Sequence, residues 1–149
     1  MPKAERKHIV AHKAADMFDL VCDVEQYPRF VPLCQSLNIT SRKDRGDKTL
    51  LIADMTMAYG VLSETFTTQV LMKREDLAID VKYIDGPFKY LDNEWRFTDL
   101  EDDTCEIHFM VDYELKSRML QMAAGAVFDR AFAKFTAAFE ERANEVYGT

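Results

Sequence analysis

The sequence predicts an α+β fold in which a curved antiparallel sheet of about seven strands wraps around one long C-terminal helix. Between residues 36 and 115, apolar and polar residues alternate with a period of two, which is typical of an antiparallel meander with one wet face. Beyond this region, Phe128, Phe132, Phe135 and Phe139 recur at helical spacing. A sheet with one apolar face needs a cover, and the C-terminal helix is the only predicted element long enough to provide it.

Two short elements are predicted before the meander. Residues 5–12 alternate as a strand, and residues 13–24 have the apolar spacing of a helix. His8 and His12 share one face of the strand, but the strand rise places them roughly 13 Å apart. That distance is too large for one metal ion, so no metal site is expected here.

An apolar segment pinned by two prolines follows, over residues 27–34. Each proline disfavours helical geometry in the residue before it, so a long helix cannot continue through this segment. Loops normally lie in water, yet this one carries Tyr27, Phe30, Val31 and Leu33. It either folds back to plug the core or presents apolar groups to a ligand or a membrane.

Six further strands are predicted from the alternating pattern, with turn signals such as Asp85-Gly86-Pro87 between them. The strands cover residues 37–43, 51–59, 62–72, 77–83, 91–97 and 105–113. Gly60 is placed where it would break or bulge the pattern. A sheet of this width around one rod is not easily filled by side chains alone, so a cavity between sheet and helix is expected.

The C-terminal stretch, residues 117–147, contains no proline and predicts one rod of roughly 46 Å. Its first part, residues 119–128, carries no charge, and a helix that is apolar all round is normally buried on more than one side. One interpretation is a close contact between helix and sheet. The other is a thin wall beside a cavity, with Met119 and Met122 as flexible lining.

Length and composition indicate one domain spanning residues 1–149, long enough to bury about 68–70% of its unfolded surface. No stretch approaches the roughly 20 apolar residues that span a bilayer. The N-terminal residues lack the apolar core of a signal peptide. A cytoplasmic location is therefore expected, free or peripheral on the cytoplasmic face of the inner membrane.

The formal net charge of −7 sets up a field that repels phosphate backbones, so nucleic acid is not an expected partner. Cys22, Cys34 and Cys105 are widely spaced, which argues against both a disulfide framework and a zinc site. Buried free thiols are expected instead. Neither a metal nor a catalytic cofactor is predicted, and the oligomeric state is left open.

No catalytic motif is present: the chain has no Gly-rich phosphate loop, no HExxH and no GxSxG. His108 falls on the polar phase of its strand, which predicts a solvated, salt-bridged histidine. Asp92, Glu94 and Arg96 share a wet face, and cross-strand ion pairs explain them. Asn93 differs, because it lies in phase with inward apolar neighbours; it would meet a ligand carbonyl, a water or a backbone group.

Two motifs resemble those of a known family. The segment at residues 27–34, YPRFVPLC, resembles the YPxFxPxC segment of the coenzyme Q-binding START-type proteins. The segment at residues 85–97, DGPFKYLDNEWRF, resembles their DGPFKxLxxxWxF segment, and the end of the final helix is also similar. The resemblance covers essentially the whole chain. It implies a helix-grip fold, as in START and birch-pollen-allergen proteins, with a hydrophobic pocket.

The resemblance further implies binding of ubiquinone or a similar isoprenoid lipid, as a non-catalytic carrier or chaperone that supports respiratory electron transport. Some bacterial relatives are named ribosome-association toxins, so a regulator that binds the large ribosomal subunit is the alternative. Asn93 stands where the toxin-named branch has glycine, which favours the quinone. A third possibility is an enzyme, because polyketide cyclases share this fold, but the sequence places no acid or base in the chamber.

The candidate ligand-binding residues are those predicted to face the chamber or its entrance. They are Tyr27, Phe30, Val31, Leu33, Met55, Met57, Tyr83, Phe88, Leu91, Asn93, Trp95, Phe109, Met119, Met122 and Phe128. Three apolar surfaces among them, at residues 27–34, 85–88 and 119–128, would surround the gap between helix and sheet. They either form a mouth that touches the membrane and admits the quinone, or are ordinary core closure.

Overall fold

The computed structural model describes residues 3–59 and 61–148. Within these ranges, some side chains lie outside the description: those of Lys3, Ala4, Tyr59, Leu62, Ala123, Ala124, Gly125 and Phe128. The prediction that Gly60 breaks or bulges a strand therefore concerns a residue outside the described part of the chain.

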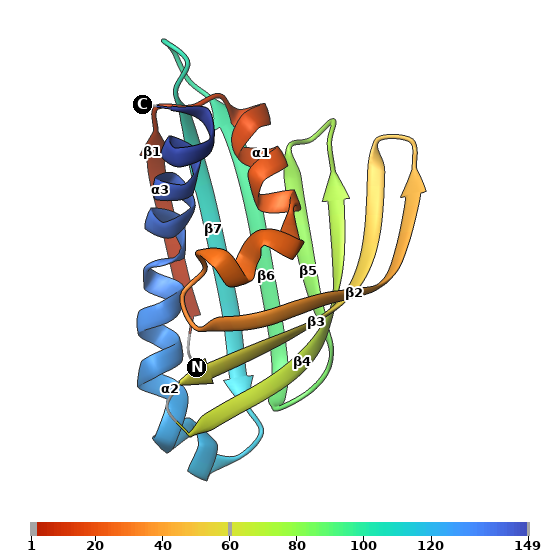
Figure 1. The fold of residues 1–149 in the computed structure, drawn as a ribbon, viewed down its shortest axis with the longest axis vertical. Helices are drawn as coiled ribbons and strands as arrows, with labels where there is room; N and C mark the ends of the chain where they lie inside the picture. Colours follow the sequence, from red (N-terminus) through yellow and green to blue (C-terminus); the bar gives the residue numbers. More distant parts are fainter. Residues whose placement is uncertain (1–2, 60, 149) are drawn as a thin grey trace.

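The elements follow the predicted order of strand, helix, helical turn, six strands and a helical C-terminus (Figure 1). They are β1 (Lys3–Val10), α1 (Ala14–Cys22), η1 (Val24–Arg29), β2 (Cys34–Arg45), β3 (Lys48–Tyr59), β4 (Leu62–Lys73), β5 (Ala78–Asp85), β6 (Phe88–Asp99), β7 (Cys105–Leu115), α2 (Arg118–Ala133) and α3 (Phe135–Tyr147).

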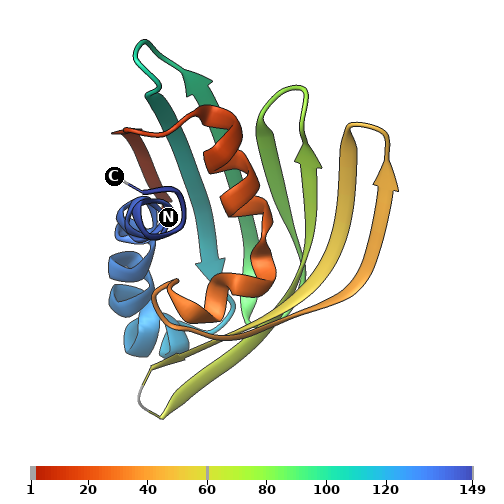
Figure 2. The ribbon, with the colours of Figure 1, turned by 45° about the horizontal axis from the view of Figure 1, so that its top comes forward.

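The strands form one antiparallel sheet of seven strands in the order β1-β7-β6-β5-β4-β3-β2. Consecutive strands from β2 to β7 are neighbours, as expected for a meander, and β1 joins the far edge beside β7. The sheet curls, and the helices lie inside its concave face (Figure 2). The predicted helix-grip fold is confirmed.

The cover of the sheet is shared, which differs from the single rod predicted. α1 contacts β6 and β7 and buries Met17, Phe18 and Val21, while η1 lies against β2. The residues of α1 have the apolar spacing of a core-facing helix, so this short element takes part of the apolar face. The C-terminal helices therefore lie mainly over β1 and β7.

The C-terminal rod is interrupted at Lys134, so the prediction of one continuous helix is wrong. The Lys134 N–H bonds to the Ala131 and Phe132 carbonyls, which closes a tight last turn of α2. A second helix, α3, starts at Phe135. No proline or glycine marks this position. The two halves pack on different partners, α2 on β7 and β1 and α3 on α1 and β1, and this packing overrides a sequence that favours an unbroken helix.

The proline-pinned segment plugs the core, which is one of its two predicted roles. Val24, Val31 and Cys34 are buried, and Phe30 packs against Phe139 with ring centroids 5.0 Å apart. The Tyr27 hydroxyl donates to the Val21 carbonyl at 2.5 Å, which ties the segment to α1. The apolar side chains of this segment thus pack against the protein interior.

We predict that Gly86→Ala destabilises the fold strongly. Gly86 has φ +142, and an added Cβ would lie 2.6 Å from the Phe66 Cβ and 2.9 Å from its Cα. The expected loss is about 2–4 kcal/mol in the free energy of unfolding, measured by urea denaturation. Gly46→Ala is the matched control, because Gly46 also has positive φ but nothing within 4 Å, and it should lose only about 1–2 kcal/mol. Equal losses would show that the close approach to Phe66 is unimportant.

Candidate ligand-binding site

A cavity of about 80 Å³ lies between the concave face of the sheet and its helical cover. Seven predicted residues line it: Tyr27, Met55, Met57, Leu91, Asn93, Trp95 and Phe109. Twelve further residues complete the lining: Val24, Leu37, Ala53, Phe66, Thr68, Val70, Ile79, Val81, Val111, Phe132, Phe135 and Phe139. The expected cavity is therefore present.

The additional lining residues carry a signal in the sequence. Ala53, Phe66 and Val81 lie in the same strand phase as the predicted ones, so the period of two would have placed them inward. Thr68 obeys the same rule, since it lies two residues from Phe66 and from Val70. Because Thr68 is polar, the pattern of apolar residues alone does not predict it as cavity lining.

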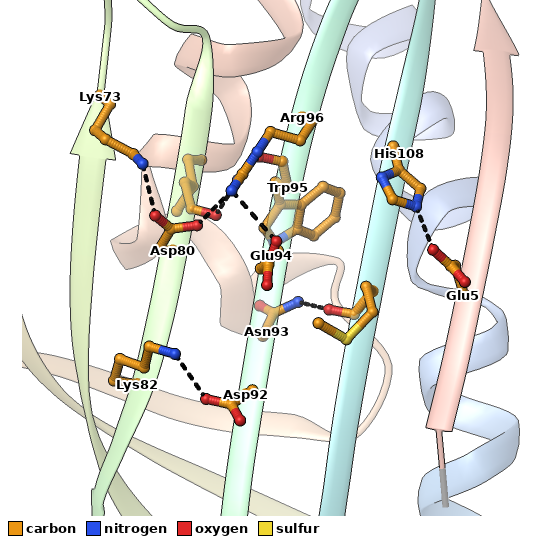
Figure 3. A network of polar contacts seen from close by, with 12 residues as sticks. Glu5, Lys73, Asp80, Lys82, Asp92, Asn93, Glu94, Trp95, Arg96 and His108 are labelled. Carbon is orange, nitrogen blue, oxygen red and sulfur yellow. Dashed lines mark hydrogen bonds and ion pairs between the residues drawn. The ribbon is translucent and has the colours of Figure 1, made fainter.

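Three polar side chains reach this cavity: Tyr27, Thr68 and Asn93. Burial raises the pKa of the Tyr27 phenol well above 10, so this group stays neutral. Asn93 Nδ2 donates to the Met110 carbonyl on β7 at 2.8 Å (Figure 3). The predicted inward position of Asn93 is confirmed, and of its three predicted partners the structure shows the backbone group.

A group of charged residues on β4, β5 and β6 lies on the other face of the sheet. Asp80 forms ion pairs with Lys73 at 2.7 Å and with Arg96 at 2.9 Å, and Lys82 pairs with Asp92 at 3.0 Å (Figure 3). Burial by itself would raise the pKa of Asp80, but its hydrogen bonds to Lys73 and Arg96 outweigh burial and lower it. The predicted cross-strand ion pairs are confirmed for Asp92 and Arg96, whereas Glu94 pairs with Arg96 on its own strand at 3.2 Å.

The histidines have structural partners. His108 pairs with Glu5 at 2.6 Å, across β7 and β1, so the predicted salt bridge is present (Figure 3). His8 and His12 bond to Glu140 and Asn144 of α3, each at 2.7 Å. Among the residues that the structure describes, no group of His, Cys, Asp and Glu could hold a metal ion.

The three cysteines are free, and two of them are fully buried. Burial raises the pKa of Cys34 and of Cys105 to about 11, and that of Cys22 to about 12. A thiol with so high a pKa is protonated at neutral pH and is a poor nucleophile.

Several predicted site residues lie elsewhere. Phe88 is only 1% exposed and packs against Phe66, Tyr83 and Tyr113, below the turn at Gly86. Tyr83 supports this turn, because its hydroxyl oxygen accepts from the Phe88 N–H at 3.1 Å. Phe88 and Tyr83 therefore close the core instead of lining the cavity, because the turn directs the Phe88 ring into the protein interior.

The same correction applies to Phe30, Val31 and Leu33 of the proline-pinned segment. Val31 is buried, and Phe30 is half-buried between the Phe139 ring and the Arg142 guanidinium, which lies 5.5 Å from its centroid. Leu33 adopts φ +66 where the chain turns into β2. None of the three lines the cavity, because Tyr27 and Val24 fill that side of the segment.

The start of α2 does not form a cavity wall. Met119 is 79% exposed and Met122 is 87% exposed, so the interpretation of these methionines as cavity lining is wrong. Leu120 packs against the core, and α2 contacts β7 and β1, so a contact between this helix and the sheet is present. The side chain of Phe128 lies outside the described residues.

A comparison with protein-family models matches residues 10–140 to the family of polyketide cyclase / dehydrase and lipid transport proteins. The chain belongs to this family. The START-type resemblance of the two motifs is thereby confirmed. None of the helices that the structure describes is long and apolar enough to cross a bilayer.

Curated relatives carry two kinds of name. The ribosome association toxin RatA of Escherichia coli K12 is 35% identical over 147 residues, which are 99% of this chain and 90% of that protein. The mitochondrial coenzyme Q-binding protein COQ10 of Drosophila melanogaster is 32% identical over 127 residues, which are 83% of this chain and 51% of that protein.

Solved structures confirm the architecture. The 18 kDa protein CC1736 from Caulobacter crescentus has a TM-score of 0.81 and 31% identity, with 100% of both chains covered. The Zhui aromatase/cyclase from a Streptomyces species has a TM-score of 0.79 at 16% identity, covering 97% of this chain and 95% of that one. At this identity, the second likeness concerns the fold alone.

We predict that Phe88→Ala costs about 3–5 kcal/mol in the free energy of unfolding, because Phe88 is fully buried among aromatic rings. Phe30→Ala should cost clearly less, because Phe30 is half-buried and loses fewer contacts. Chemical denaturation of both variants measures the difference. Near-normal stability of Phe88→Ala would reverse the assignment of Phe88 to core closure.

Proposed function

We propose that this protein is a non-catalytic carrier or chaperone for ubiquinone or a similar isoprenoid quinone, in support of respiratory electron transport. The observation that carries the proposal is the cavity, whose lining is apolar apart from Tyr27, Thr68 and Asn93. An apolar chamber with few placed polar groups suits an apolar ligand that carries ring oxygens. The name of COQ10, a coenzyme Q-binding relative, supports the same ligand.

The size of the cavity limits how the ligand binds. At about 80 Å³ it is smaller than the roughly 300–1,000 Å³ typical of pockets for drug-sized ligands. Binding of a quinone ring therefore requires lining side chains to move, and Met55 and Met57 are flexible enough to repack. A long isoprenoid tail exceeds the chamber and protrudes from it. Each stretch of tail that is buried contributes about 25 cal/mol per Å².

The proposal includes no catalytic step. Among the described residues that line the cavity, Tyr27 carries the one titratable group, and its phenol already donates to the Val21 carbonyl. General acid–base catalysis needs a group whose pKa lies near the working pH, and burial moves the pKa of Tyr27 away from it. Although the Zhui aromatase/cyclase has a similar fold, the proposed function does not include the reaction of that enzyme.

Ribosome binding is the second candidate function, and the similarity to RatA over nearly the whole chain favours it. The net charge of −7 opposes a large RNA footprint, because a surface that binds RNA must neutralise phosphates. A contact with a ribosomal protein would not need such neutralisation. Quinone binding is the preferred function because the apolar cavity offers a binding site for such a ligand.

We predict that delipidated protein binds ubiquinone saturably and in preference to phospholipid. Trp95 is the one tryptophan of the chain and lines the cavity, so a bound quinone should quench its fluorescence. Titration with a short-tailed ubiquinone, followed by gel filtration, measures both binding and co-elution. Absence of quenching and of co-elution, together with co-sedimentation with the large ribosomal subunit at about 150 mM salt, would replace this proposal by the second one.

Loading from a membrane is proposed to occur at the start of α2. Met119 and Met122 are exposed there, and Lys116 and Arg118 beside them are also exposed. No acidic residue occurs between positions 116 and 128, although the whole chain is acidic. Exposed apolar groups flanked by bases favour transient contact with anionic lipid headgroups. Among the described residues of the predicted mouth, Met119 and Met122 are the large apolar side chains that lie open to solvent.

We predict that the double variant Met119→Ser/Met122→Ser slows quinone transfer from anionic vesicles several-fold, while its melting temperature stays close to that of the parent. Both side chains are exposed, so their removal costs little packing. Val146→Ser is the control: Val146 is also exposed, near the opposite end of the C-terminal helices (Figure 1). Equal transfer by the parent and the double variant would contradict a membrane contact at this surface.

A further inference from the structure

Thr68 of β4 is a buried residue whose hydroxyl forms no hydrogen bond with the described part of the chain. It is 7% exposed, and its side chain lines the cavity. Among the described residues, its hydroxyl has no hydrogen-bond partner. Buried hydroxyls are normally paired, because leaving one unpaired costs the hydration it had in water. A hydroxyl kept in this position calls for a partner that enters the cavity.

The other threonines of β4 and of its neighbour β3 have hydrogen-bond partners. Thr67 donates to Asp54 at 2.5 Å, Thr56 and Thr65 bond to each other at 2.7 Å, and Thr49 donates to Asp44 at 2.8 Å. All of these pairs involve side chains on the wet face or the strand ends. The unpaired hydroxyl thus coincides with the cavity.

A register shift positions Thr68. Thr68 pairs with Tyr83 on β5, whereas Thr67 pairs with Asp85, so β5 carries one extra residue, Ile84, opposite the step between the two threonines. On its other side, Thr68 faces Ala53 of β3, whose methyl group leaves space above the sheet. Ala53 also lines the cavity. The chamber is therefore open where the hydroxyl lies.

Asn93 of β6 supplies a second polar point. One of its amide N–H groups is used by the Met110 carbonyl. Its other N–H and its carbonyl oxygen have no partner among the described residues. Asn93 pairs with Val81, which pairs with Val70 on β4, two residues from Thr68. Thr68 and Asn93 thus share the concave face with one strand between them, which suits two oxygens on opposite sides of a ring.

We propose that Thr68 and Asn93 are the two polar anchors for an oxygen-substituted ring, a quinone or its quinol. The inference rests on the proposed function and assigns its specificity. A hydroxyl and an amide each donate and accept hydrogen bonds. They pair with a quinone carbonyl, which accepts, or with a quinol hydroxyl, which donates. No proton is transferred to the protein, so the site holds both redox states of the ring.

The test compares Thr68→Val with the matched control Thr67→Val. Valine keeps the shape of threonine and removes only the hydroxyl. The two probes are a ubiquinone with a two-unit isoprenoid tail and squalene, an isoprenoid without oxygen. We expect Thr68→Val to weaken quinone binding about five- to tenfold, as for loss of one hydrogen bond. Squalene binding by Thr68→Val, and the binding of both probes by Thr67→Val, should stay unchanged.

Thermal melting provides a readout that needs no ligand. Thr68→Val should melt at or above the parent, because it removes an unpaired buried hydroxyl, whereas Thr67→Val should melt lower. A lower melting temperature for Thr68→Val would show that the hydroxyl is bonded inside the protein and would overturn the inference.

The remaining outcomes separate the inference from the proposed function. Unchanged quinone binding by Thr68→Val, or an equal loss for quinone and squalene, overturns the anchor and leaves the carrier proposal standing. A parent protein that binds squalene but not quinone overturns both, and so does a parent that binds neither probe.

Discussion

The packing of the Phe139 ring is the contact on which the rest of the structure depends. This side chain of α3 is 1% exposed, and its ring centroid lies 5.3 Å from Tyr27, 5.0 Å from Phe30 and 5.1 Å from Trp95. All three contacts are edge-to-face, the arrangement that aromatic quadrupoles favour. One ring therefore joins the helical cover, the proline-pinned segment and the middle of the sheet. Because Tyr27, Trp95 and Phe139 all line the cavity, the same contact forms one of its walls.

The protein separates its charges from its cavity. The ion pairs of Asp80, Lys82 and Arg96 lie on the face of the sheet opposite the helices, where water and neighbouring charges satisfy them (Figure 3). The described residues that line the cavity offer only neutral polar groups, on Tyr27, Thr68 and Asn93. Such groups can orient a ligand through hydrogen bonds. The family includes members with different functions, and the fold alone does not distinguish between them.

Stability and binding make opposite demands at Thr68. An apolar residue there would fill the chamber and remove an unpaired hydroxyl, and both changes would favour the folded state. The same exchange would remove a polar group that a ligand with ring oxygens can recognise. Small Ala53 opposite Thr68 and flexible Met55 and Met57 nearby leave room for side chains to adjust. The cavity in the core is thus the part with a proposed function.

Periodicity alone determined the sheet, its strand order along the chain and the inward position of Asn93, because side chains alternate strictly between the two faces of a strand. It also placed His108 and the ion pairs outside. Periodicity does not say which inward residue meets a void and which meets a neighbour. Only the tertiary structure showed that Phe88 closes the core and that α2 leaves Met119 and Met122 exposed. It also showed that Thr68 lines the cavity, with no hydrogen bond from its hydroxyl to the described residues. The break at Lys134 was also visible only in the tertiary structure. Local helix propensity favours one continuous helix, but the two halves pack on different sets of elements and form two helices.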